Sequence, residues 1–311
     1  MNTLPDDRLI EEVALLMGIT EAYVEKDWYV TQVTKLLATD QYEDVELVFT
    51  GGTSLSKAHK LIQRFSEDID FRVVVPSLQG LAGSAIKKRL SAYKQHLVER
   101  LAQRFTILRV EGRDSNRHIM IDLAYPTRYP PALALRPHIK LEFTLSSLAL
   151  PSVVLPVSSF VHEMARRLPE VEGIACINPV ENAVDKLSAL LWRIPSRVRG
   201  EGDRQPDVVR HLHDLAQLSQ LALAHTQFAA LAVEAIERDA NRSEALKGMS
   251  IVEKIDTMRR IVATDGAYAV EYSTFVQGMS YAAEKPVPTF EEAMEKVNQL
   301  TDRLEHYLDA L

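Results

Sequence analysis

The sequence has a single cysteine, Cys176, among its 311 residues. One cysteine excludes an internal disulfide framework and a zinc site built from several cysteines, so we interpret Cys176 as a small buried hydrophobic residue. Long apolar runs are also missing. The longest uncharged stretch, residues 143–161, contains two prolines and several serines and predicts a strand and a loop, not a membrane span. The acidic N-terminus lacks the basic region of a signal peptide, and we expect a cytoplasmic protein.

An excess of basic residues is missing as well. The chain has 36 lysines and arginines against 43 aspartates and glutamates, a formal net charge of −7. Composition therefore does not indicate nucleic-acid binding, and any RNA contact must use a local basic patch. The sequence has no GxxxxGK[ST] motif, which excludes a P-loop. The remaining composition is that of a soluble globular protein with one large or two modest domains.

The most informative stretch is VFTGGTSLSK, residues 48–57. Its apolar start predicts a short strand, and Gly51 and Gly52 predict a tight turn at which a ligand can approach the backbone closely. Thr53 or Ser54 can then cap a following helix. Because free backbone N–H groups at such a turn attract phosphate, these four residues predict a phosphate-binding turn.

A second strand, predicted over residues 68–75, alternates between apolar and polar residues. Ile69 and Phe71 point to one face, while Asp68 and Asp70 lie side by side on the other. Two carboxylates held in this way need a counter-charge, and a divalent cation is the usual one. The strand therefore predicts a metal site at Asp68 and Asp70.

A phosphate-binding turn followed by a carboxylate pair on the next strand is the layout of a nucleotidyltransferase site. With GGTxLxK at residues 51–57 and SEDIDF at residues 66–71, the chain resembles the AbiEii/AbiGii nucleotidyltransferase toxins of the polymerase-β-like superfamily. The resemblance covers roughly residues 20–220. It implies an α+β fold with a mixed-sheet nucleotidyltransferase core and N-terminal helices over residues 1–158. A C-terminal helical domain would follow over residues 159–311, with the active site in the cleft between them.

Enzymes of this superfamily need a third carboxylate from a neighbouring strand. Two further alternating segments, residues 118–124 and 138–145, each place an acidic residue on the outer face, Asp122 and Glu142 respectively. We favour Glu142, because its strand alternates more cleanly and the resemblance points there. Asp122 stays the alternative.

The helical half contains two more residues that the resemblance makes functional. Lys186 lies in ENAVDKLSAL, residues 181–190, and Asp214 in an Arg-x-x-x-Asp-Leu segment. Taken alone, Lys186 would extend to water, and Asp214 would form a surface pair with Arg210 worth a few tenths of a kcal/mol. The resemblance instead implies that Lys186, with Lys57, neutralises a triphosphate. Asp214 would orient Lys186 or an acceptor group, and the sequence does not choose between these roles.

Three charged segments have simpler interpretations. Residues 25–28, Glu-Lys-Asp-Trp, are expected on a solvated helix face anchored by the tryptophan, although the family has a similar run there. Lys60 and Arg64 are expected on the solvated face of the helix after the turn. Basic residues cluster on a helix predicted over residues 84–104, which makes it the first choice for an RNA-facing patch.

The resemblance implies a nucleotidyltransferase toxin of a toxin–antitoxin or phage-defence system. It would transfer a nucleoside monophosphate from a triphosphate to an RNA hydroxyl, with the tRNA 3′ end as the implied acceptor, and release pyrophosphate. Asp68 and Asp70 would bind Mg²⁺, or Mn²⁺ in its place. Glu142 would help to activate the attacking hydroxyl. A separate antitoxin protein is implied too, and its direct contact with the toxin stays open.

Two alternatives remain open from the sequence. One is a phosphotransferase of the same fold that modifies a protein or a small molecule. The other is a non-catalytic module that binds a nucleotide or RNA. The intact Asp68-x-Asp70 pair argues against a loss of catalysis.

Overall fold

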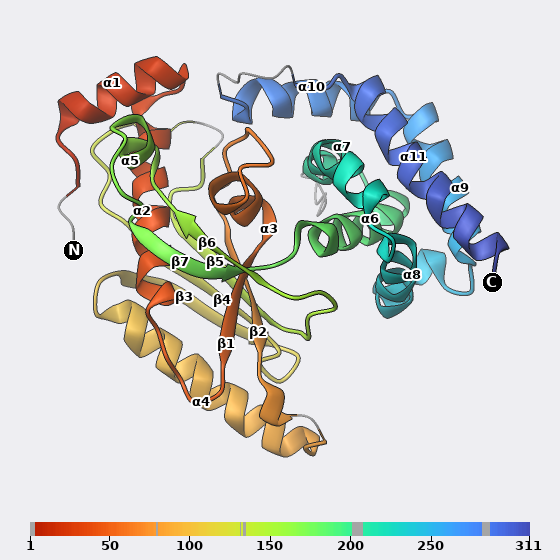
Figure 1. Cartoon of the computed structure of the whole chain (residues 1–311), viewed down its shortest axis with the longest axis horizontal. Coiled ribbons are helices and arrows are strands. Elements are labelled where there is room, and N and C mark those ends of the chain that lie inside the picture. The colour runs from red at the N-terminus through yellow and green to blue at the C-terminus, as the bar shows by residue number, and fades with distance from the viewer. Residues whose placement is uncertain (1–3, 79, 131, 133–134, 201–207, 282–286) are drawn as a thin grey trace. The chain divides into compact units, whose positions relative to one another are not determined.

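The computed structural model describes residues 4–78, 80–130, 132, 135–200, 208–281 and 287–311. The chain forms two compact units, Met1–Ile177 and Asn178–Leu311 (Figure 1). The first contains the sheet and the second is helical, so the fold is α+β, as the sequence predicts.

The first unit is built on a mixed seven-stranded sheet with the strand order β3-β4-β5-β2-β1-β7-β6. β2 runs parallel to β5 and β1 runs parallel to β7, whereas the other neighbours are antiparallel. The strands are β1 (Glu46–Thr50), β2 (Ile69–Val74), β3 (Thr106–Arg113), β4 (His118–Ala124), β5 (Ile139–Leu145), β6 (Val153–Val157) and β7 (Val171–Cys176).

The first unit also contains helices and helical turns (Figure 1). They are α1 (Asp7–Met17), α2 (Glu21–Ala38), α3 (Gly51–Thr53), the π-helical turn η1 (Ser54–Ala58), the 3₁₀ turn η2 (Pro76–Leu78), α4 (Gly83–Ala102) and α5 (Phe160–Met164). α2 and α4 share one apolar core with alternate residues of β2, β4 and β5. Because side chains alternate along a strand, the polar residues of those strands lie on the opposite face.

Several local predictions are confirmed. α1 begins after Asp6, whose carboxylate accepts the N–H of Leu9 at 2.9 Å, and it ends at Gly18 in the left-handed conformation. β1 has the predicted bounds. The helix expected after the Gly-Gly turn is shorter, because η1 ends at Ala58 and Lys60 already has a positive φ of 55°.

The first unit extends past the boundary expected at residue 158. The sequence predicts helices from about Phe160 onward, but only the short α5 follows there, and the chain then returns to the sheet as β7. β7 lies between β1 and β6, so residues 159–177 belong to the first unit. Edge strand β3 was not foreseen either, because its side chains are largely exposed on both faces and leave no alternation to detect.

The charged run in α2 is buried, so the interpretation of a solvated face is wrong. Glu25, Lys26 and Asp27 are at most 2% exposed. Lys26 forms an ion pair with Glu67. The carboxylate of Glu25 accepts the backbone N–H of Arg128 at 3.0 Å. Helical periodicity could not reveal this burial, because these partners lie far away in the sequence.

Asp27 has its own buried partner. Its carboxylate pairs with the ammonium of Lys57 and accepts the N–H of Phe160 at 2.7 Å. Burial raises the pKa of Asp27 and lowers that of Lys26, and in each case the charged partner opposes the shift. α2 therefore contributes two internal ion pairs, one to η1 and one to the segment just before β2.

The second unit is a helical bundle. Its helices are α6 (Pro179–Ser196), α7 (Val208–Ala224), α8 (Phe228–Arg238), α9 (Ile251–Thr264), α10 (Ala267–Met279) and α11 (Phe290–Asp309), with short 3₁₀ turns η3 (Ala240–Arg242) and η4 (Glu244–Leu246). α6 packs against α7, α8 and α9. It begins as predicted, with Asn178 accepting the N–H of Val180 at 3.0 Å. Within the described ranges, no helix has both the length and the apolar character needed to cross a membrane.

Removing the ammonium of Lys26 should destabilise the first unit strongly. Lys26→Met would leave the Glu67 carboxylate buried without its counter-charge, which typically costs about 3–5 kcal/mol. Urea unfolding followed by circular dichroism measures the change. Lys35→Met is the matched control, because Lys35 lies on the same helix and is half-buried. It should change the free energy of unfolding by less than about 0.5 kcal/mol. Equal losses in the two variants would contradict the assigned role of the pair.

Candidate functional site

The Gly-Gly turn lies directly against one of the predicted carboxylates. β1 ends at Thr50, which is in register with Asp70 on β2. Gly51 follows with a φ of 74°, and a Cβ placed on it would overlap the carboxylate of Asp70, only 3.0 Å from its Cγ. Only glycine combines this conformation with such a close approach. The turn and Asp70 therefore form one local structure.

The next three residues of the turn are buried. A Cβ on Gly52 would overlap the guanidinium of Arg64 and come within 2.8 Å of the Ser66 hydroxyl. Thr53 donates its hydroxyl to the carbonyl of Asp68, which joins the turn to the start of β2, and Ser54 is fully buried. Of residues 51–54, Gly51 is thus the one that is not buried. Arg64 is buried against Gly52, so its expected place on a solvated face is wrong.

Lys57 points into the interior. Its ammonium is paired with Asp27, both side chains are almost fully buried, and the charge lies 5.0 Å from the centre of the Phe160 ring. This pair fixes η1 to α2. Because its ammonium is paired with the Asp27 carboxylate, Lys57 stabilises the turn from the interior of the unit.

Asp70 and Glu142 are immediate neighbours on the polar face of the sheet. In the parallel pairing of β2 with β5, these two residues are in register, so their side chains project to the same side. Glu142 is also paired with Lys140 and lies 3.9 Å from the His118 ring. Asp122 is on the next strand, in register with Lys140. Position thus favours Glu142 over Asp122 as the carboxylate beside Asp70.

Asp68 has a partner that the sequence analysis missed. The guanidinium of Arg136 forms an ion pair with Asp68, and its Nη1 lies 3.7 Å from the Glu67 carboxylate. Arg136 belongs to the irregular segment before β5. No motif marks it, because its contact with Asp68 spans 68 positions of the chain.

The carboxylates have the chemistry of a magnesium site. Within the described part of the chain, no group of three or more histidine, cysteine, aspartate or glutamate side chains converges to hold an ion. Mg²⁺, however, usually takes one or two protein carboxylates and completes its shell with water and substrate phosphates. Asp68 and Asp70, beside the turn at Gly51, fit that arrangement.

The basic helix α4 lies on the other side of the sheet. Its Leu90, Tyr93 and Leu97 pack into the apolar core, on the face opposite Asp70 and Glu142. One of its basic residues is also committed to an ion pair, since Arg89 contacts Asp44. The RNA-facing patch expected on this helix stays a prediction, and its position does not place it beside the carboxylates.

In the second unit, Lys186 and Asp214 form a buried ion pair. The Lys186 ammonium on α6 lies 2.8 Å from the Asp214 carboxylate on α7, and both side chains are at most 8% exposed. His213 Nδ1 lies 3.3 Å from the same carboxylate. The two residues that the resemblance singled out are thus in direct contact, and Asp214 is too deeply buried for the expected surface pair.

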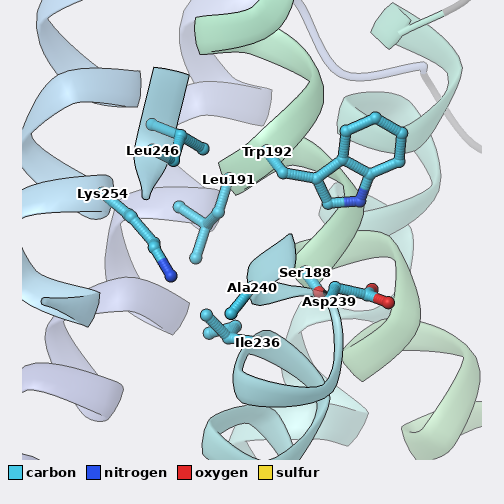
Figure 2. Close-up of a pocket in the computed structure, with 8 residues that line it drawn as sticks. All are labelled: Ser188, Leu191, Trp192, Ile236, Asp239, Ala240, Leu246 and Lys254. Atoms are coloured by element: carbon cyan, nitrogen blue, oxygen red, sulfur yellow. Dashed lines mark hydrogen bonds between the residues drawn. The ribbon is translucent and has the colours of Figure 1, made fainter. Parts of the chain in front are cut away.

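A small pocket in the second unit is separate from this pair (Figure 2). Its empty volume is about 210 Å³, which includes space open to solvent. Ser188 donates to Asp239 at 2.8 Å in its wall, and the amine of Lys254 points into it. None of the residues predicted to be functional lines the pocket.

The effect of the close approach of Gly51 to Asp70 on stability can be measured by comparison with a second glycine, Gly80. Gly80 has a similar φ of 77° but open space around it. Both Gly51→Ala and Gly80→Ala should incur the strain of a left-handed residue, about 1–2 kcal/mol. Gly51→Ala should lose at least about 1 kcal/mol more, because the Asp70 carboxylate must also move. Chemical denaturation of both variants measures the difference, and equal losses would contradict the contact.

Comparisons with known proteins show the family to which the chain belongs. The sequence matches the family model described as nucleotidyl transferase AbiEii toxin, type IV toxin–antitoxin system, over residues 35–296. Among solved structures, it is similar to MenT4, a nucleotidyltransferase toxin from Mycobacterium tuberculosis H37Rv. That similarity has 17% identity and a TM-score of 0.48, over 95% of this chain and 99% of that chain. A search of curated proteins finds no match. Since the family match spans most of the chain, the protein belongs to the AbiEii family of nucleotidyltransferase toxins of type IV toxin–antitoxin systems.

Proposed function

We propose that the protein transfers a nucleoside monophosphate from a nucleoside triphosphate to a hydroxyl of an RNA acceptor and releases pyrophosphate. The observation that carries this proposal is the row formed by Gly51, Asp70 and Glu142. Gly51 contacts the Asp70 carboxylate, and Asp70 is in register with Glu142. The proposed phosphate-binding backbone, metal ligand and base would thereby lie on three adjacent segments.

The candidate site residues of the first unit have the following proposed roles. Asp68 and Asp70 would hold Mg²⁺ or Mn²⁺, which supplies charge neutralisation at the α-phosphate when bound. Backbone N–H groups at Gly51 and Gly52 would bind the outer phosphates. Glu142 would accept the proton of the attacking hydroxyl. Thr53 and Ser54 would shape the turn from within, since both are buried.

The two lysines have different proposed roles: one positions the turn and the other binds the triphosphate. Lys57 would position the turn, because its ammonium is already paired with Asp27. Lys186 would neutralise the triphosphate, and Asp214 would orient it, since their charged groups are 2.8 Å apart. This contact favours the orienting role of Asp214 over a role in holding the acceptor.

The proposed acceptor and partner rest on the family resemblance. A tRNA 3′ end is the acceptor that the resemblance implies, and a separate antitoxin protein is the expected partner. Because α4 covers the opposite face, the acceptor would approach the polar face of β2 and β5.

Transfer should be visible with labelled substrate and should depend on Asp70. The protein is incubated with total RNA, Mg²⁺ and each of the four α-labelled nucleoside triphosphates in turn. We expect label in RNA, and a loss of at least about a hundredfold in Asp70→Asn, since one charge-neutralising contact accounts for several kcal/mol at such centres. Asp114→Asn is the control, because Asp114 is an exposed turn residue.

Near wild-type incorporation by a folded Asp70→Asn variant would refute the site. Binding of a triphosphate without any release of pyrophosphate would support the non-catalytic alternative. Labelling of protein instead of RNA would support a phosphotransferase of the same fold.

The pair in the second unit predicts a pattern of non-additive losses. Lys186→Ala should lose a charge-assisted contact of about 1.5–3 kcal/mol, or roughly ten- to a hundredfold in rate. If Asp214 acts by orienting Lys186, the double variant with Asp214→Ala should be little worse than the worse single variant. Single-turnover rates measure the cycle, with melting temperatures to confirm folding. Fully additive losses would mean independent roles, and a wild-type rate in Lys186→Ala would remove Lys186 from the site.

A further inference from the structure

Arg136 lies outside both sequence motifs, yet it contacts a predicted metal ligand. Its guanidinium pairs with Asp68. The side chain of Arg136 is 30% exposed and that of Asp68 is 21% exposed, so both can be reached from solvent. A positive group thus already occupies one of the two carboxylates that would bind the cation.

The backbone of Arg136 is held by a buried ion pair. Its N–H donates to Glu67 at 2.9 Å, and its carbonyl accepts the Lys26 ammonium at 2.7 Å. Lys26 and Glu67 are paired with each other and are almost fully buried. The main chain of Arg136 is therefore fixed beside Asp68, while its side chain is partly exposed to solvent.

Local charge explains what an arginine does at this position. Glu67, Asp68 and Asp70 place three carboxylates within four residues. Lys26 compensates Glu67 in the interior. Arg136 compensates Asp68 at the surface before any metal ion arrives.

We propose that Arg136 is an exchangeable counter-ion, which leaves Asp68 when a divalent cation binds and then contacts the phosphates of the incoming nucleotide. A cation and a guanidinium repel each other and compete for the same carboxylate oxygens. A triphosphate offers the displaced guanidinium the planar, bidentate pairing that arginine favours. Metal and nucleotide would therefore bind cooperatively, each raising the affinity for the other by the same factor. The proposal rests on the metal and nucleotide sites of the proposed function.

Calorimetric titration with Mn²⁺ in the absence of nucleotide tests the competition. We expect Arg136→Gln to bind Mn²⁺ about tenfold or more tightly than the wild type, because the competing charge is gone. Arg117→Gln is the matched control, since Arg117 also faces an aspartate, Asp114, but in a surface turn. It should leave the affinity for Mn²⁺ unchanged.

A second titration tests the transfer of the guanidinium to phosphate. The α,β-methylene analogues of the four common nucleoside triphosphates are added one at a time, and the affinity for Mn²⁺ is measured again. The wild type should gain more affinity from the analogue than Arg136→Gln does. Arg136→Lys should fall between them, because it keeps the charge but loses the bidentate geometry. This variant also keeps the test usable if Arg136→Gln does not fold.

The possible failures are distinguishable. If the wild type binds Mn²⁺ only with an analogue present, and Asp70→Asn abolishes this binding, the proposed metal site stands whatever Arg136 does. Equal or weaker affinity for Mn²⁺ in folded Arg136→Gln would then overturn the role of Arg136 alone. If the wild type binds no Mn²⁺ even with every analogue, the proposed function itself fails, and the role of Arg136 fails with it.

Discussion

The buried ion pair between Lys26 and Glu67 is the interaction on which the carboxylate site depends. It joins α2 to the residue just before Asp68, and both of its members also bind the backbone of Arg136. Burying two charges is costly unless their remaining hydrogen-bonding capacity is used, and here the peptide groups of Arg136 use it. The pair therefore stabilises one particular arrangement of the segments around Asp68. The segments around Asp68 are held in one arrangement because the buried charges and peptide groups beside it must all be paired.

The same helix supports the phosphate-binding turn through a second pair, Asp27 with Lys57. Several residues of the two motifs thus act as scaffold and only some would act in chemistry. Lys57, Thr53 and Glu67 are bonded inside the protein, whereas Asp70 stays partly exposed beside Gly51. The two sequence motifs contain both kinds of residue. The burial of each side chain in the structure distinguishes them.

Much of the fold could be predicted from the sequence, because local signals and tertiary structure agree. Alternation predicted β2, β4 and β5, and capping side chains in the sequence mark the starts of α1 and α6. The turn and the pair of Asp68 and Asp70 became candidates from such local patterns, and Glu142 from its alternating strand together with the family resemblance. The buried run at residues 25–27 and the role of Arg136 could not be predicted, because both depend on partners distant in sequence. β3 and β7 escaped because neither carries a clear alternating pattern.

The central claim is that Asp68 and Asp70 together form the metal-binding centre of a nucleotidyltransferase. The most direct measurement is anomalous diffraction from crystals grown with Mn²⁺ and a non-hydrolysable nucleoside triphosphate. The account predicts a manganese peak within about 2.0–2.3 Å of carboxylate oxygens of both residues, with a phosphate oxygen completing its shell. A nucleotide bound with its metal ion away from both carboxylates would contradict the account.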